Sequence, residues 1–146
     1  MKSETPHHNV EIDERFPSGP YRGFYEQMGI RSRQRLSLRF YSGKVTGDGS
    51  DPCDPFSLSG DYDVNSGRVQ WVKRYLSHEV EYLGRVMPGE GIVGTWQIRG
   101  RTGRAHDSGR FRVWPDEVKM QESRLLREKA PVTASETQWL ETAVSR

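Results

Sequence analysis

The chain has a single cysteine, Cys53, among its 146 residues. One cysteine cannot form an internal disulfide bond, and it cannot supply a zinc site built from cysteines. Long apolar runs are lacking too, because none approaches the roughly 18 residues with which a helix spans a bilayer. The first fifteen residues also contain no hydrophobic segment of the signal-peptide kind. We therefore expect a soluble cytoplasmic protein without a membrane partner.

Apolar residues as a whole are scarce. They make up 33% of the chain, against roughly 45–50% in an average globular chain on a count that includes glycine. The four Trp, six Tyr and five Phe must therefore supply much of the core, because each ring residue can bury roughly 150–250 Å². Fifteen glycines and eight prolines suit a fold with many turns and disfavour a helical bundle. A net charge of +2 gives no general reason to expect a nucleic-acid partner.

Short segments that alternate apolar and polar residues dominate the middle of the chain, separated by clusters of Gly, Asp, Asn and Pro. A period of two is typical of strands with one buried face. Seven such segments are expected at 23–28, 35–41, 56–62, 69–75, 80–84, 92–98 and 111–113, and Val45 is a candidate continuation of the second. Short turns between them predict an antiparallel up-and-down barrel of about seven to eight strands, which hides one face and removes the edges.

The flanking residues differ in composition. Residues 1–22 are polar, with three prolines and the pair His7-His8, and show no period, so we expect a disordered N-terminal arm. Glu117–Lys129 is rich in helix formers, and Thr133 to Glu136 has the spacing of a capping box before Trp139. The prediction is a mainly β protein, with one barrel over 23–115 and a short helical appendage over 116–146.

Three short sequences resemble strands of the calycin-type barrels, which include the avidins, the lipocalins and the fatty-acid-binding proteins. Gly23-Phe-Tyr-Glu-Gln27 resembles their glycine-aromatic first strand, Phe56-Ser-Leu-Ser-Gly-Asp-Tyr62 a following strand, and Gly94-Thr-Trp-Gln97 a later one. Gly23-x-Tyr25 stands where lipocalins have Gly-x-Trp, and the biotin-binding residues of avidins are not carried over. The resemblance covers about residues 23–114 and implies a barrel, whose contents the fold alone does not specify.

Strict alternation places Lys73 on the inward face of its segment, with Trp71 and Tyr75 two positions away on either side. An enclosed lysine loses hydration, and its pKa falls unless a carboxylate or a ligand anion pairs with it. The predicted ligand cup with one charged anchor consists of Lys73, Tyr62, Tyr75, Tyr82, Trp71 and Trp96. The alternative is that Lys73 lies at the barrel rim and extends to water with its stem over Trp71.

Four arginines are expected on the outer face: Arg99, Arg101, Arg110 and Arg112. Like charges that face each other across strands are destabilising, and Glu26 should lie between this set and the arginines of the second segment. Such a face could bind an anion or a nucleic acid. The alternative is solvated, partly paired charge.

The sequence contains no recognisable catalytic motif: neither a nucleophile elbow, nor a phosphate loop, nor His-Glu-x-x-His, nor a dinucleotide fingerprint. His78, His106, Asp107 and the tyrosines would be the reagents of an enzyme. Asp48, Asp51 and Asp54 lie at three-residue spacing and are followed by Asp61 and Asp63, so this region could offer oxygen ligands to calcium. The spacing does not match the EF-hand pattern, and Asp also suits a turn. We therefore expect no catalysis, no metal and no cofactor.

Three hypotheses follow for the function. The leading one is a barrel that binds a small, partly apolar and acidic ligand in its interior. The runner-up is a protein-interaction module with a solid core, which would use its outer face, its arm or the Trp139 helix. The third is a nucleic-acid or anion surface on the arginine-rich outer face, and it is the least favoured.

Overall fold

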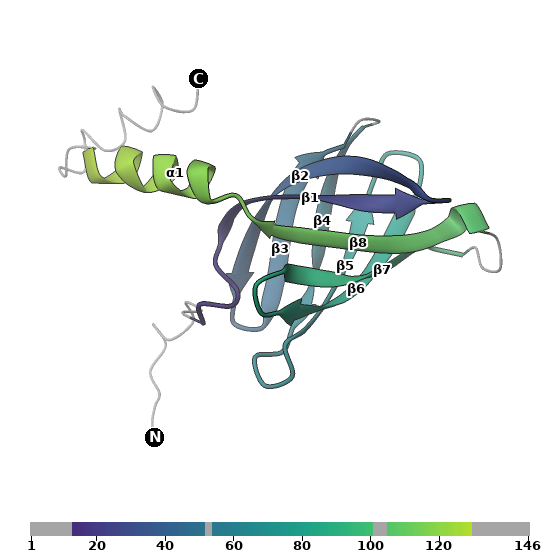
Figure 1. Ribbon diagram of the computed structural model, residues 1–146, viewed down its shortest axis with the longest axis horizontal. Helices are drawn as coiled ribbons and strands as arrows, with labels where there is room; N and C mark the ends of the chain where they lie inside the picture. Colours follow the sequence, from purple (N-terminus) through teal and green to yellow (C-terminus); the bar gives the residue numbers. More distant parts are fainter. Residues whose placement is uncertain (1–12, 52–53, 101–104, 130–146) are drawn as a thin grey trace. The chain divides into compact units, whose positions relative to one another are not determined.

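A computed structural model describes residues 13–51, 54–100 and 105–129, and it shows a closed antiparallel β-barrel (Figure 1). The eight strands are β1 (Gly19–Gln27), β2 (Ile30–Tyr41), β3 (Lys44–Ser50), β4 (Pro55–Tyr62), β5 (Arg68–Arg74), β6 (Glu79–Met87), β7 (Gly91–Ile98) and β8 (Ser108–Pro115). Each strand pairs with the next in the chain, and β8 pairs with β1. The predicted up-and-down barrel is confirmed, and its closure pairs the two strands that would otherwise be edges.

Eight strands form where seven alternating segments were counted, because the chain turns at Gly43. Ser42 and Gly43 have φ angles of 49° and 80°, which belong to the left-handed region that tight hairpins use. Val45 therefore lies on β3, beside Phe40 of β2, and does not continue the second strand. The second strand itself begins earlier than expected, at Ile30 instead of Arg35.

The barrel interior is filled by aromatic side chains in layers. At one end, which we call the Phe16 end, the rings of Phe16, Phe40 and Tyr62 contact one another with centroids 4.8–5.3 Å apart. In the middle, Trp71 stacks on Tyr82 at 5.8 Å, and Phe111 packs against both rings. The opposite end, which we call the Tyr75 end, carries the cavity described below.

The barrel begins before the expected boundary at residue 23. β1 starts at Gly19, and Phe16 is only 1% exposed because it packs inside the Phe16 end. The hydroxyl of Ser18 also accepts a hydrogen bond from the backbone N–H of Phe40, at 2.9 Å. Residues 13–22 of the expected arm therefore belong to the barrel, whereas residues 1–12 lie outside the described residues.

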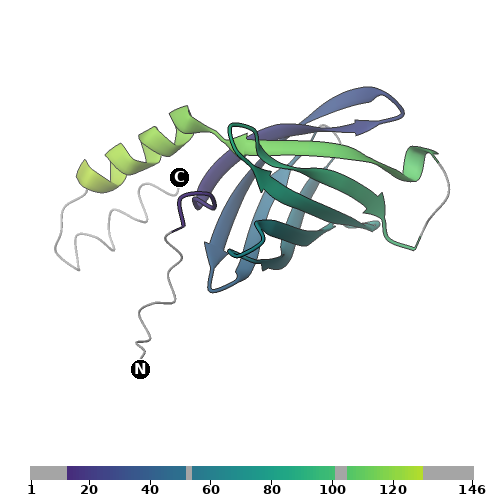
Figure 2. The same cartoon turned by 60° about the horizontal axis from the view of Figure 1, so that its bottom comes forward.

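Gly23 allows β1 and β8 to approach closely at the seam that closes the barrel, where the two strands lie side by side (Figure 2). A Cβ atom at this position would lie 1.9 Å from the backbone oxygen of Arg112. Backbone cannot move aside as a flexible side chain can.

We expect Gly23→Ala to lower the free energy of unfolding by about 3 kcal/mol, as measured by urea unfolding. Gly29→Ala is the control, because nothing lies within 4 Å of its Cβ position and only its left-handed backbone costs about 1 kcal/mol; an equal loss in both variants would contradict this account of the seam.

The chain after Asp116 forms a second compact unit. Its helix α1 spans Glu117–Lys129, as the composition predicts. Lys119 and Glu122 face each other one turn apart, with Nζ and Oε1 separated by 3.8 Å. The predicted capping box and Trp139 lie outside the described residues. In the part of the chain that the structure describes, no helix is long and apolar enough to cross a membrane.

Candidate functional site

Lys73 lies inside the barrel and is fully buried, with 0% of its surface exposed. Its Nζ donates a hydrogen bond of 2.6 Å to Oε1 of Gln34. The amide of Gln34 is held in turn, because its Nε2 donates to the backbone oxygen of Phe24 at 3.2 Å. Lys73 therefore does not extend to water at the barrel rim. The alternative interpretation of the sequence, which placed it there, is wrong.

Three aromatic rings surround the amine of Lys73. Its Nζ lies 4.2 Å from the ring centroid of Phe56, 4.6 Å from that of Tyr82 and 5.7 Å from that of Tyr25. The faces of such rings carry negative potential, so they stabilise a cation more than an aliphatic wall would. They replace only part of the hydration that the ammonium loses.

No carboxylate among the described residues lies within ion-pair distance of Lys73. Burial lowers the pKa of the amine to about 7, and the charge of Asp51 opposes this shift only in part. Desolvation disfavours the charged form of a group that has no counter-ion. The amine therefore changes its protonation state near neutral pH.

A cavity of about 140 Å³ opens at the Tyr75 end, and Lys73 itself does not line it. Its walls combine apolar residues and rings with polar groups, and they comprise Tyr25, Gln27, Asp51, Asp54, Tyr75, His78, Val80, Tyr82, Trp96 and Ile98. Tyr25 and Tyr82 belong both to this wall and to the aromatic shell around Lys73. A ligand in the cavity would therefore lie one side chain away from the amine.

The polar side of the cavity is built around Asp51. Its carboxylate accepts a short hydrogen bond from the hydroxyl of Tyr75 and a second one, at 3.2 Å, from the backbone N–H of Asp54. His78 stacks flat on Tyr75, with centroids 4.8 Å apart and an interplanar angle of 6°. Burial, followed by the hydrogen bond to Asp51, raises the pKa of Tyr75. Burial is also the main cause that raises the pKa of Tyr82, so both phenols remain neutral at physiological pH.

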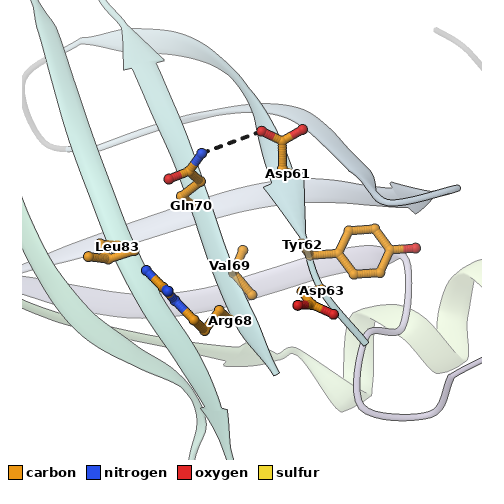
Figure 3. Close-up of a pocket in the computed structure, with 7 residues that line it drawn as sticks. All are labelled: Asp61, Tyr62, Asp63, Arg68, Val69, Gln70 and Leu83. Carbon is orange, nitrogen blue, oxygen red and sulfur yellow. Dashed lines mark hydrogen bonds between the residues drawn. The ribbon is translucent and has the colours of Figure 1, made fainter. Parts of the chain in front are cut away.

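The structure divides the six residues of the predicted cup among three layers. Tyr75, Tyr82 and Trp96 line the cavity, and Lys73 adjoins it. Trp71 is a core residue of the middle layer, whereas Tyr62 lies at the Phe16 end. Tyr62 borders a different hollow of about 260 Å³ on the outside of β4 and β5, and its ring points away from Gln70, Arg68 and Leu83 there (Figure 3).

Several side chains of the site were not predicted from the sequence. Gln34 was not singled out, although its position in the alternation of β2 places it inside, where an amide needs a partner. Asp51 and Asp54 were interpreted only as turn residues or weak calcium ligands, and His78 as an enzyme reagent. The signal that could have found them is their position at strand ends, where loop side chains border a barrel mouth.

The arginines of the predicted outer set occupy different surroundings. Arg99 forms ion pairs of 2.8 Å with both Glu79 and Glu81, whereas Arg110 contacts Glu26 at 3.4 Å. Arg112 donates from Nε to the backbone oxygen of Glu90 at 2.7 Å. Arg101 lies outside the described residues, so the four do not form one described cluster.

Among the other groups with possible chemistry, His106 and Asp107 do not line the cavity. Nε2 of His106 lies 3.5 Å from the buried carboxylate of Asp107. His7, His8 and Cys53 are outside the described residues. Within residues 13–51, 54–100 and 105–129, no three His, Cys, Asp or Glu side chains gather in a way that could hold a metal ion.

The site that stands out is therefore a buried amine beside a small cavity that carries carboxylates and neutral phenols. Such convergence of a cavity, a few polar groups and a perturbed pKa is typical of ligand sites. No family model matches the chain, and no curated protein and no solved structure matches it either.

Proposed function

We propose that the protein binds a small, partly apolar ligand with an acidic group in the cavity at the Tyr75 end, and that it does so without catalysis. The observation that carries the proposal is Lys73, a buried amine with no carboxylate partner among the described residues. A buried ammonium without a counter-ion is costly. The rings of Tyr25 and Tyr82 separate this amine from the cavity. We propose that they turn aside on binding, so that a ligand carboxylate supplies the counter-ion.

The size of the cavity limits the ligand. A volume of about 140 Å³ is close to that of an engineered apolar cavity of about 150 Å³ that binds benzene. The ligand therefore has roughly the size of one aromatic ring with a short substituent. Long fatty acids, which some calycin-type barrels enclose completely, could not be enclosed in this volume. The resemblance to such barrels still supports ligand binding within a barrel.

The aromatic layers restrict the space that a ligand can occupy. Rings fill the Phe16 end and the middle of the barrel, and these layers suit the solid core of the alternative hypothesis. The ligand proposal is therefore confined to the Tyr75 end. There, Asp51 and Asp54 on one side and Lys73 on the other favour a ligand that also carries a hydrogen-bond donor.

Benzoate is the probe that tests this proposal, and neutral benzamide of the same shape is its control. We expect benzoate to shift the NMR signals of residues that line the cavity, with an affinity that falls roughly tenfold between pH 7 and pH 8.5, because the ammonium loses its proton over this range. Benzamide should bind more weakly and show no such pH dependence.

Two lysine variants complete the test. Lys73→Met should weaken benzoate binding at least about tenfold, whereas Lys44→Met should not, because Lys44 pairs with Asp61 on the outer surface at 2.8 Å. Circular dichroism checks that both variants fold. Equal binding to wild type and Lys73→Met, or no shift of any cavity residue, would contradict the proposal.

A further inference from the structure

Positive charge is concentrated on the outer face of β8, β1 and β2, although the whole chain is nearly neutral. The strand registers place nine outward residues there in three rows, which are Trp114-Arg22-Arg35, Arg112-Phe24-Arg33 and Arg110-Glu26-Arg31. Six arginines thus face one glutamate. We call these nine residues the arginine face.

Much of this charge has no counter-ion among the described residues. Glu26 pairs with Arg31 at 3.0 Å and with Arg110 at 3.4 Å. Within the described part of the chain, no carboxylate lies at ion-pair distance from Arg22, Arg33 or Arg35. Arg22 and Arg35 lie directly opposite each other on adjacent strands, where like charges are destabilising. An external anion would remove that repulsion.

The face is hollowed as well as charged. A groove of about 530 Å³ has Arg22, Arg31, Arg33 and Arg35 along its walls, together with Phe24. Trp114 of β8 also lines the groove. The groove is therefore large enough for several groups of an extended ligand, and four arginines line it.

Aromatic rings are interleaved with the arginines, although the sequence pattern placed the aromatic residues mostly on the other side of the barrel wall. The guanidinium of Arg31 lies 3.9 Å from the ring centroid of Phe24, and that of Arg112 lies 4.6 Å from the Trp114 ring. These contacts hold the guanidinium groups against the surface. Planar guanidinium groups and rings both stack on nucleobases, and guanidinium N–H groups bind phosphates in a bidentate manner.

From this combination we propose that the arginine face binds single-stranded nucleic acid. Single-stranded binders combine a positively charged groove with aromatic stacking groups. An acidic protein would use the arginines but would have no need of the two rings. Of the three strands under the arginine face, only β1 contributes residues to the cavity, namely Tyr25 and Gln27. This proposal therefore does not rest on the ligand proposed there.

The test is fluorescence anisotropy with a labelled single-stranded DNA of about 15 nucleotides and mixed sequence. We expect binding whose logarithmic salt dependence has a slope of roughly −3, as about four phosphate contacts would give. The double reversal Arg22→Glu and Arg35→Glu should weaken binding by roughly 30-fold or more, because phosphate contacts are lost and repulsion replaces them.

The matched control is a second pair of arginines on the barrel. Arg68 and Arg85 also lie directly opposite each other, on β5 and β6, so Arg68→Glu with Arg85→Glu makes the same change in charge elsewhere. It should weaken binding less than about threefold. Trp114→Leu should weaken it about tenfold through lost stacking, with thermal unfolding as the check on folding.

Three results would overturn the proposal. The first is an absence of binding by the wild-type protein at low salt. The second is an equal loss of affinity in both charge reversals, which would indicate attraction to net charge alone. The third is that the wild-type protein binds polyglutamate as tightly as single-stranded DNA and that Trp114→Leu does not weaken this polyglutamate binding. That result would identify a surface for acidic proteins.

Discussion

Between pH 7 and pH 9, the free energy of unfolding of the wild-type protein should rise by roughly 2 kcal/mol because of Lys73. Burial lowers the pKa of this amine from 10.5 to about 7 in the folded protein. Between these two values the unfolded chain holds a proton that the folded chain has released, so stability increases with pH. Below pH 7 both states are protonated, and the full cost of about 5 kcal/mol applies.

Other groups limit the window of this measurement. The raised pKa values of Tyr75 and Tyr82 act in the opposite direction above about pH 10, because the unfolded chain then loses phenolic protons that the folded chain keeps. Urea unfolding at pH 7, 8 and 9 therefore avoids the phenolic titration, and comparison with Lys73→Met separates the amine from the histidines and the α-amino group.

Lys73→Met should remove the increase in stability with pH. At pH 7 this variant should be at least as stable as wild type. It leaves the Gln34 oxygen without its donor, which costs about 1–3 kcal/mol, but it removes the larger cost of the buried amine. Lys44→Met, which alters an exposed lysine, should keep the increase. A wild-type stability that does not change with pH would show that the amine stays charged in the folded protein. A Lys73→Met variant that retains the increase would show that another group causes it.

The second large effect concerns Phe16. We expect Phe16→Ala to lower the free energy of unfolding by about 3–5 kcal/mol, because the loss of a buried ring leaves a cavity. The ring is 1% exposed and contacts both Phe40 and Tyr62. Urea unfolding measures the loss, and Leu76→Ala is the control because the side chain of Leu76 is fully exposed (106%). A loss below about 1 kcal/mol in Phe16→Ala would mean that the segment before β1 does not pack inside the Phe16 end of the barrel.

The strand period alone predicted the barrel and the inward position of Lys73. Alternation on β5 puts Val69, Trp71 and Lys73 on one face, and all three are buried. The eighth strand was less apparent, because a single Gly43 is compatible with either a bend or a turn. The turn became clear only when Val45 and Phe40 were seen as neighbours on paired strands.

Depth within the barrel could not be predicted from alternation. The period assigns a residue to a face but not to a layer, so Tyr62 and Tyr75 appeared equivalent although they lie at opposite ends. Phe16 carries no periodic signal because it precedes the first strand. Phe24 and Trp114 occupy outward positions on paired strands, and only the closure of β1 on β8 brings them together with the arginines.

The central claim is that the cavity beside Lys73 holds a small acidic ligand, and mass spectrometry of protein gently purified from its own host tests it most directly. Native and denaturing spectra of wild type and Lys73→Met should be compared. We predict one extra mass of roughly the size of a substituted aromatic ring in the native wild-type spectrum, absent after denaturation and absent from Lys73→Met. The same bound mass in both proteins, or a bare chain in both native spectra, would contradict the account.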